Sequence, residues 1–98
     1  MAQATIDFTA RAEALARYLG AMFPTAGIER YENAECVGFR FIGAPHANVE
    51  FERDWLSGLP ANADAIAQEM HLNRVCAEIN DTPQTQRVIF GSAGVRRA

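Results

Sequence analysis

The sequence predicts an α+β domain in which one helix is followed by three strands, a second helix and a last strand. In two segments the apolar residues recur every three or four positions, as on one face of a helix, and between these segments they recur at every second position, as in strands. Consecutive strands bracketed by helices favour an antiparallel sheet with the helices on one face. We therefore expect an antiparallel meander of three or four strands with two helices packed on one face.

The first helix is expected from about Thr9 to Leu19. Its apolar side chains fall on one helical face, at Phe8, Ala12, Leu15, Leu19 and Met22. Asp7 or Thr9 can cap its first turn by accepting a backbone N–H. Gly20 and Pro24 lie in the region where the helix should end.

Three strands are expected next, over Ile28–Glu32, Cys36–Ile42 and Asn48–Asp54. The second strand has the clearest alternation, which predicts a core face formed by Val37, Phe39 and Phe41. A hairpin loop over residues 43–47 then sets the register of the second and third strands. The expected cross-strand pairs are Phe41 with Val49, Phe39 with Phe51 and Arg40 with Glu50.

The second helix is expected from about Pro60 to Ile79, with Asn62 and Asp64 in its first turn. Arg87–Gly91 is predicted to be a short apolar strand, which could pair with either the first or the third strand. The 98 residues, of which 49% are hydrophobic and 21% charged, are typical of one globular domain. We expect a single domain over 1–98, with loose ends near 1–5 and 92–98.

Membranes and nucleic acids are both disfavoured as partners. No apolar run reaches the ~20 residues of a membrane helix, and the first residues do not resemble a secretory signal, so we expect a cytoplasmic protein. The net charge is −3, whereas nucleic-acid-binding proteins usually present clustered basic residues.

The cysteines and histidines do not have the spacing of a metal site. His71 and Cys76 are five positions apart on a predicted helix, which separates them by roughly 140° around its axis. Cys36 and Cys76 lie in apolar surroundings, which suits reduced core thiols. We expect no metal and no cofactor.

The candidate interaction surface lies on the face of the sheet opposite the core. Gly38 is in the middle of a strand, where a glycine often marks a bulge or the close approach of a ligand or another backbone. Trp55 follows the charged third strand, where it could anchor an interface or close one end of the core. The residues of this candidate surface are Tyr31, Gly38, Arg40, Glu50, Glu52 and Trp55.

Two functions remain open from the sequence. The first is a small acidic, non-enzymatic domain that binds another protein, or itself, through the charged face or an exposed edge of the sheet. The alternative is a small-molecule-binding domain or modest enzyme with a pocket between the sheet and the second helix. Its polar groups would be Arg40, Glu50 or Glu52, and His71. No catalytic or phosphate-binding motif is present. The acidic faces and the unpaired first strand favour the first function.

Overall fold

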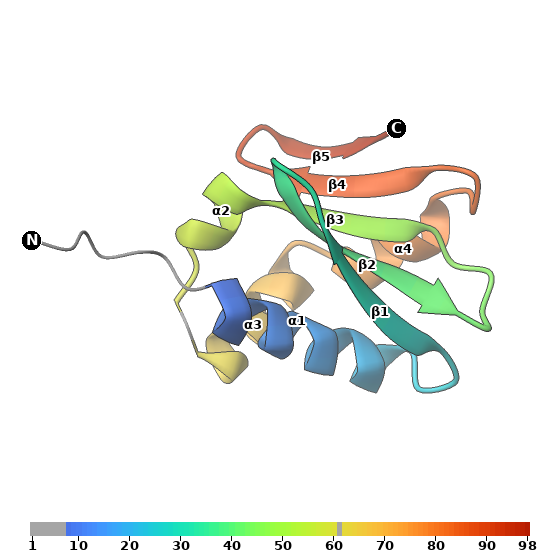
Figure 1. Ribbon diagram of the computed structural model, residues 1–98, viewed down its shortest axis with the longest axis horizontal. Coiled ribbons are helices and arrows are strands. Elements are labelled where there is room, and N and C mark those ends of the chain that lie inside the picture. The colour runs from blue at the N-terminus through green and yellow to red at the C-terminus, as the bar shows by residue number, and fades with distance from the viewer. Residues whose placement is uncertain (1–7, 61) are drawn as a thin grey trace, which may run out of the picture.

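The computed structural model describes residues 8–60 and 62–98, which form four helices and a five-stranded sheet (Figure 1). The class is α+β, as expected, but the expectation of two helices and of three or four strands is wrong. The elements are α1 (Phe8–Met22), β1 (Gly27–Glu32), β2 (Cys36–Ile42), β3 (Asn48–Glu52), α2 (Arg53–Ser57), α3 (Ala63–Leu72), α4 (Val75–Asp81), β4 (Arg87–Gly91) and β5 (Gly94–Arg97).

The sheet has the strand order β1-β2-β3-β4-β5 and is mixed. Every neighbouring pair is antiparallel except β3 and β4, which are parallel. The prediction of a purely antiparallel meander is therefore wrong. A parallel connection needs a crossover, and here α2, α3 and α4 supply it. The strand predicted over Arg87–Gly91 has the expected bounds and pairs with the third strand, not the first.

The hairpin between β2 and β3 has a different register from the expected one. Phe39 pairs with Val49, and Gly38 pairs with Glu50. The expected pairing of Arg40 with Glu50 is therefore wrong by two residues. A shift of two residues leaves every side chain on its predicted face, because side chains alternate with a period of two.

The second predicted helix is divided into α3 and α4. The amide oxygen of Asn62 caps α3 by accepting the backbone N–H groups of Asp64 and Ala65. The division falls at Arg74, whose φ of 55° places it in the left-handed region. The helix α2 was not predicted at all. For α1, Asp7 lies outside the described residues and Thr9 lies within the helix rather than at its cap.

The segment expected as a loose tail instead forms β5. It pairs with β4 through Gly94–Arg97, and the backbones of Arg87 and Ala98 exchange two hydrogen bonds beyond the last strand residues. Arg97 also fastens β5 to α4, since its guanidinium donates to Thr82 Oγ1 and to Glu78 Oε1, each at 2.7 Å. The tail is thus an edge strand.

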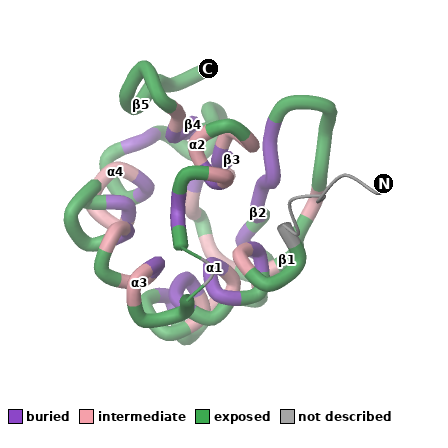
Figure 2. Tube along the Cα trace, turned by 90° about the vertical axis from the view of Figure 1, so that its left-hand side faces the viewer, coloured by how far each residue is buried: buried purple, intermediate pink, exposed green. Residues whose placement is uncertain are grey.

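The core lies between the sheet and the helices, as Figure 2 shows from the side. Phe51 is central to it, because its ring packs edge-on against Phe39 and stacks on Phe90 and Trp55. Buried residues of α1, α3 and α4 close this layer, among them Leu15, Leu19, Ile66, Met70, Val75 and Ile79. The opposite face of the sheet is covered by no described helix.

Candidate functional site

The face of the sheet that points away from the helices, called the open face below, carries a row of side chains that crosses all five strands. Because Val37, Phe39 and Phe41 enter the core, their neighbours on β2 project to the open face. Cross-strand pairing then aligns one residue from each strand. In strand order this row contains Tyr31, Gly38, Glu50, Ile89 and Arg96.

At the β1 end of the row, a tyrosine ring lies over a glycine. A Cβ atom added to Gly38 would be 2.3 Å from Cζ of Tyr31, so only glycine leaves room for the ring in this position. From there the Tyr31 hydroxyl donates a hydrogen bond to Glu50 Oε2 at 2.7 Å. Gly38 thus allows a side chain of the edge strand to reach the central strand.

Glu50 is the most buried charged residue among those described, with 2% of its surface exposed. Its carboxylate accepts from Tyr31 and from Nη1 of Arg87, at 3.3 Å. A buried carboxylate is stable only when hydrogen bonds and an opposite charge compensate for lost hydration. Tyr31 and Arg87 provide that compensation.

Two acidic groups beside Glu50 are held in their protonated forms. Burial, followed by the hydrogen bond to Glu50, raises the pKa of the Tyr31 hydroxyl above its usual value. Burial also raises the pKa of the Cys36 thiol, and the carboxylates of Glu50 and Glu52 raise it further. Cys36 is therefore not an activated nucleophile, since the thiolate is the reactive form.

Three arginines of the open face form ion pairs with glutamates. Arg40 pairs with Glu29 and its guanidinium lies 5.4 Å from the centroid of the Tyr31 ring. Arg96 pairs with Glu52 at 3.0 Å, while Arg87 pairs with Glu50. The side chains of Arg40, Arg87 and Arg96 are 48%, 49% and 57% exposed, whereas those of Glu50 and Glu52 are 3% and 28% exposed. In the pairs with Glu50 and Glu52, the guanidinium is therefore the more exposed of the two groups.

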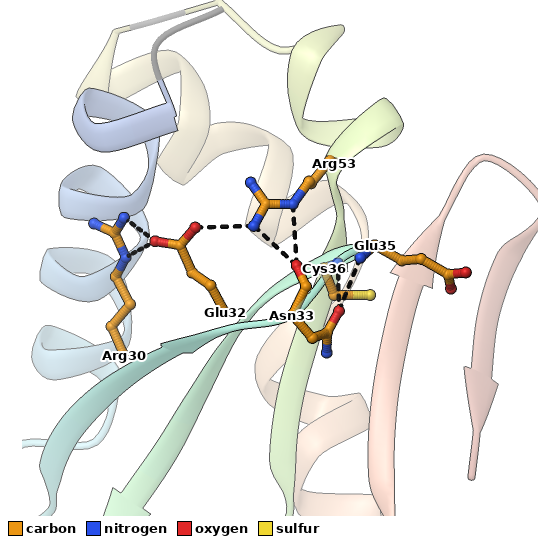
Figure 3. A network of polar contacts seen from close by, with 6 residues as sticks. All are labelled: Arg30, Glu32, Asn33, Glu35, Cys36 and Arg53. Carbon is orange, nitrogen blue, oxygen red and sulfur yellow. Dashed lines mark hydrogen bonds and ion pairs between the residues drawn. The ribbon is translucent and has the colours of Figure 1, made fainter.

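The tip of the β1–β2 hairpin forms one wall of this site (Figure 3). Asn33 stabilises the turn, because its side-chain oxygen accepts the backbone N–H groups of Glu35 and Cys36 at 3.0 and 2.8 Å. Arg53 of α2 ties the tip to the helices by donating to Glu32 and to the backbone oxygen of Asn33, each at 2.9 Å. Hydrogen bonds within the turn and from α2 therefore hold the turn in place.

A hollow of about 320 Å³ lies between this tip and the last two strands. It is lined by Asn33, Ala34, Glu35, Cys36, Glu50, Arg87, Ile89 and Arg96. A second hollow of about 350 Å³ lies nearby and is lined by Ala34, Glu35, Glu52, Arg53 and Asp54. Only the first hollow includes the buried carboxylate and two guanidinium groups.

The structure brings five of the six candidate surface residues together on the open face. The sixth, Trp55, lies on the opposite side of the sheet, where it stacks on Phe51 and Phe90 at 5.8 and 6.2 Å between ring centroids. Trp55 thus closes the core, the second of the two roles considered for it. The sequence did not indicate Arg87 and Arg96 as site residues, because their position depends on the parallel pairing and on β5.

The pocket considered between the sheet and the second helix is not formed by its expected side chains. His71 is on α3, where its ring packs edge-on against Tyr18 with 5.2 Å between centroids. Arg40, Glu50 and Glu52 belong to the sheet's other face. The sheet therefore separates His71 from the three residues expected to share a site with it.

Within residues 8–60 and 62–98, no group of three or more histidine, cysteine or acidic side chains is placed to hold a metal ion. None of the helices in the same residues has the length and apolarity needed to cross a membrane. Comparisons with models of protein families, with curated proteins and with solved structures find no significant match. The functional argument therefore depends on the geometry of the open face.

Proposed function

We propose that this chain is a non-enzymatic interaction domain that binds an acidic segment of another protein on its open face. The observation that carries the proposal is the arrangement of charge on that face. The guanidinium groups of Arg40, Arg87 and Arg96 are exposed, whereas the carboxylates of Glu50 and Glu52 are less exposed. Carboxylates of a partner can accept two parallel hydrogen bonds from such groups.

The protonation of the site supports binding rather than catalysis. Cys36 and Tyr31 are the nucleophilic side chains nearest to Glu50, and the pKa of each is raised. A catalytic nucleophile needs a lowered pKa or an adjacent base that removes its proton. Burial and the hydrogen bond to Glu50 instead stabilise the neutral hydroxyl of Tyr31 and raise its pKa.

The proposal is tested by removing charge from the open face. Immobilised wild-type protein, the double variant Arg40→Gln/Arg96→Gln and the control Arg17→Gln would each be exposed to extract from the source cell. Arg17 is an exposed residue of α1 on the helical side. Retained proteins would be compared by quantitative mass spectrometry, after melting curves had shown that all three forms are folded.

The expected result is an acidic protein that binds the wild type and the Arg17 variant but is depleted at least tenfold with the double variant. Binding should also weaken as salt is added, because exposed charges are screened. Equal retention by all three forms would overturn the proposal. Material that disappears after nuclease treatment would identify a nucleic-acid partner and would overturn it as well.

Self-association, in which the partner is a second copy of this chain, can be measured before any other partner is known. Among the described strands, β1 and β5 are the two edges of the sheet, and an edge strand can pair with another chain. Light scattering during size-exclusion chromatography would give the mass in solution. A dimer that dissociates in the double variant would identify a second copy as a partner of the open face.

A further inference from the structure

We propose that the hollow beneath the β1–β2 hairpin tip binds a small amino acid with an apolar side chain, as a zwitterion. Its carboxylate would bind Arg87 and Arg96, and its ammonium group would bind Glu50 and Glu35. The inference does not depend on a protein partner, and it adds a small-molecule site to the interaction function proposed above.

The charges that line the hollow favour a ligand that carries both signs. Arg87 and Arg96 contribute two positive charges, and Glu35 and Glu50 contribute two negative charges. Inside the hollow, a small anion would be attracted by the guanidinium groups but repelled by the carboxylates, and a small cation would be attracted by the carboxylates but repelled by the guanidinium groups. An acidic segment that crosses the outside of the face differs, because it contacts the more exposed guanidinium groups and lies farther from Glu50. A zwitterion satisfies both sets of groups at once.

The guanidinium groups retain donors for a ligand. Each guanidinium has five N–H donors. Within the described residues, the Arg87 side chain donates one hydrogen bond, to Glu50, and the Arg96 side chain donates one, to Glu52. Both side chains are about half exposed, so their remaining donors can approach a ligand carboxylate.

The hollow also provides a preformed anionic group, the carboxylate of Glu50. Glu50 lines the hollow although its side chain is only 3% exposed. Tyr31 and Gly38 fix its position from the far side, because the ring rests on the glycine and its hydroxyl donates to the carboxylate. An ammonium group that reached Glu50 would meet an oriented carboxylate and would not have to order a flexible one.

The size and the uncharged lining define the ligand further. The volume of about 320 Å³ is at the lower end of the range of roughly 300–1,000 Å³ for small-molecule pockets. Ala34 is exposed, and Ile89 and Cys36, which are 2% and 3% exposed, add a small apolar area to the lining of the hollow. This surface suits a short aliphatic or thioether side chain.

The experiment is a titration of the uniformly ¹⁵N-labelled protein, followed by backbone amide shifts. The probes are L-leucine, L-valine and L-methionine, together with two compounds that each lack one charge of leucine, namely 3-methylbutylamine and 4-methylpentanoate. At least one amino acid should produce saturable shifts in residues 33–36, 87–89 and 96. The amine and the acid should each bind at least tenfold more weakly than leucine.

Two variants test the two ends of the ligand separately. Arg96→Gln should weaken amino-acid binding at least tenfold, and Glu35→Gln should weaken it several-fold from the other end. Both residues are exposed, so these substitutions preserve the core, and a melting curve checks each fold. Arg40→Gln is the matched control, because Arg40 is on the same face but does not line the hollow.

Three results would overturn the site. These are the absence of saturable shifts with all three amino acids, binding of 4-methylpentanoate as tight as that of leucine, or unchanged leucine binding by Arg96→Gln. The control also separates this inference from the interaction function. Loss of protein binding in Arg40→Gln with normal leucine binding would show that protein binding needs Arg40 and amino-acid binding does not. Failure of the leucine titration alone would leave the interaction function intact.

Discussion

The pairing of Tyr31 with Gly38 shows how one small residue organises the open face. The ring occupies the space that a side chain at position 38 would need, and its hydroxyl then reaches the buried carboxylate of Glu50. The sequence suggested that Gly38 marks a bulge or a close approach by a ligand or another backbone. The structure instead brings a side chain from the neighbouring strand over it.

Replacing Gly38 with alanine should destabilise the protein by about 1–3 kcal/mol, the usual cost of forcing a methyl group into filled space. Gly20→Ala is the control, because a Cβ there meets nothing within 4 Å, and alanine in a helix should stabilise by roughly 0.5–1 kcal/mol. Urea unfolding followed by fluorescence of Trp55, the single tryptophan, measures both. A Gly38 variant as stable as the wild type would contradict the packing argument.

The hydrogen bond from Tyr31 to Glu50 should make stability depend on pH in the alkaline range. In the folded protein the pKa of Tyr31 is raised, first by burial and then by this hydrogen bond, above its ordinary value of about 10. The unfolded chain therefore loses the proton first. The stabilising contribution is complete below pH 10 and declines as pH rises above it.

Tyr31→Phe isolates this effect, because Tyr18 is present in both proteins. The wild type should be more stable by about 1.5–3 kcal/mol between pH 7 and 9, a value typical of a hydrogen bond to a charged group. The difference should shrink in urea unfolding at pH 10.5. A difference that stays constant to that pH would show that Tyr31 does not titrate more easily in the unfolded chain.

At the scale of elements, the break between α3 and α4 is the feature that the sequence conceals most fully. Helix breaks are usually marked by glycine or proline, but here the left-handed residue is Arg74. Val75 and Ile79 of α4 are buried on the core side, so tertiary packing compensates for the local strain. A continuous helix was the natural prediction from the composition of this segment.

Arg74→Gly should raise the free energy of unfolding by about 0.5–1 kcal/mol, because a left-handed conformation costs a residue with a Cβ atom roughly 1–2 kcal/mol and glycine much less. Arg74→Ala should bring no such gain, since alanine keeps the Cβ atom. Chemical denaturation of the wild type and the two variants measures these differences in the free energy of unfolding. Equal stabilisation by both would point to the arginine side chain rather than to the backbone.

The faces of the strands could be predicted, whereas their partners could not. Alternation along β2 and β3 depends only on local sequence, so Phe39, Phe51, Gly38 and Glu50 were assigned to the correct sides of the sheet. The register was wrong because it was inferred from an assumed loop length. The parallel contact of β3 with β4 and the addition of β5 depend on residues distant in sequence, which the pattern of any one strand does not encode.

At the scale of the whole molecule, the open face combines contributions from every part of the sheet. Tyr31 comes from one edge strand and Arg96 from the other, and Glu50 lies on the central strand between them. The candidate surface was predicted from β1, β2, β3 and Trp55, and of the four charged residues that line the hollow it included only Glu50. Arg87 and Arg96 lie on the open face only because the crossover brings β4 beside β3, and β5 then pairs with β4.

The parallel contact between β3 and β4 also determines the order in which the domain can assemble during synthesis. The β1, β2 and β3 strands can pair as soon as they leave the ribosome, because hairpins connect them. The other edge of β3 must wait for residues 53–86 and for β4. Until then the nascent chain exposes an unpaired apolar strand containing Val49 and Phe51, the kind of edge on which aggregation starts and chaperones act.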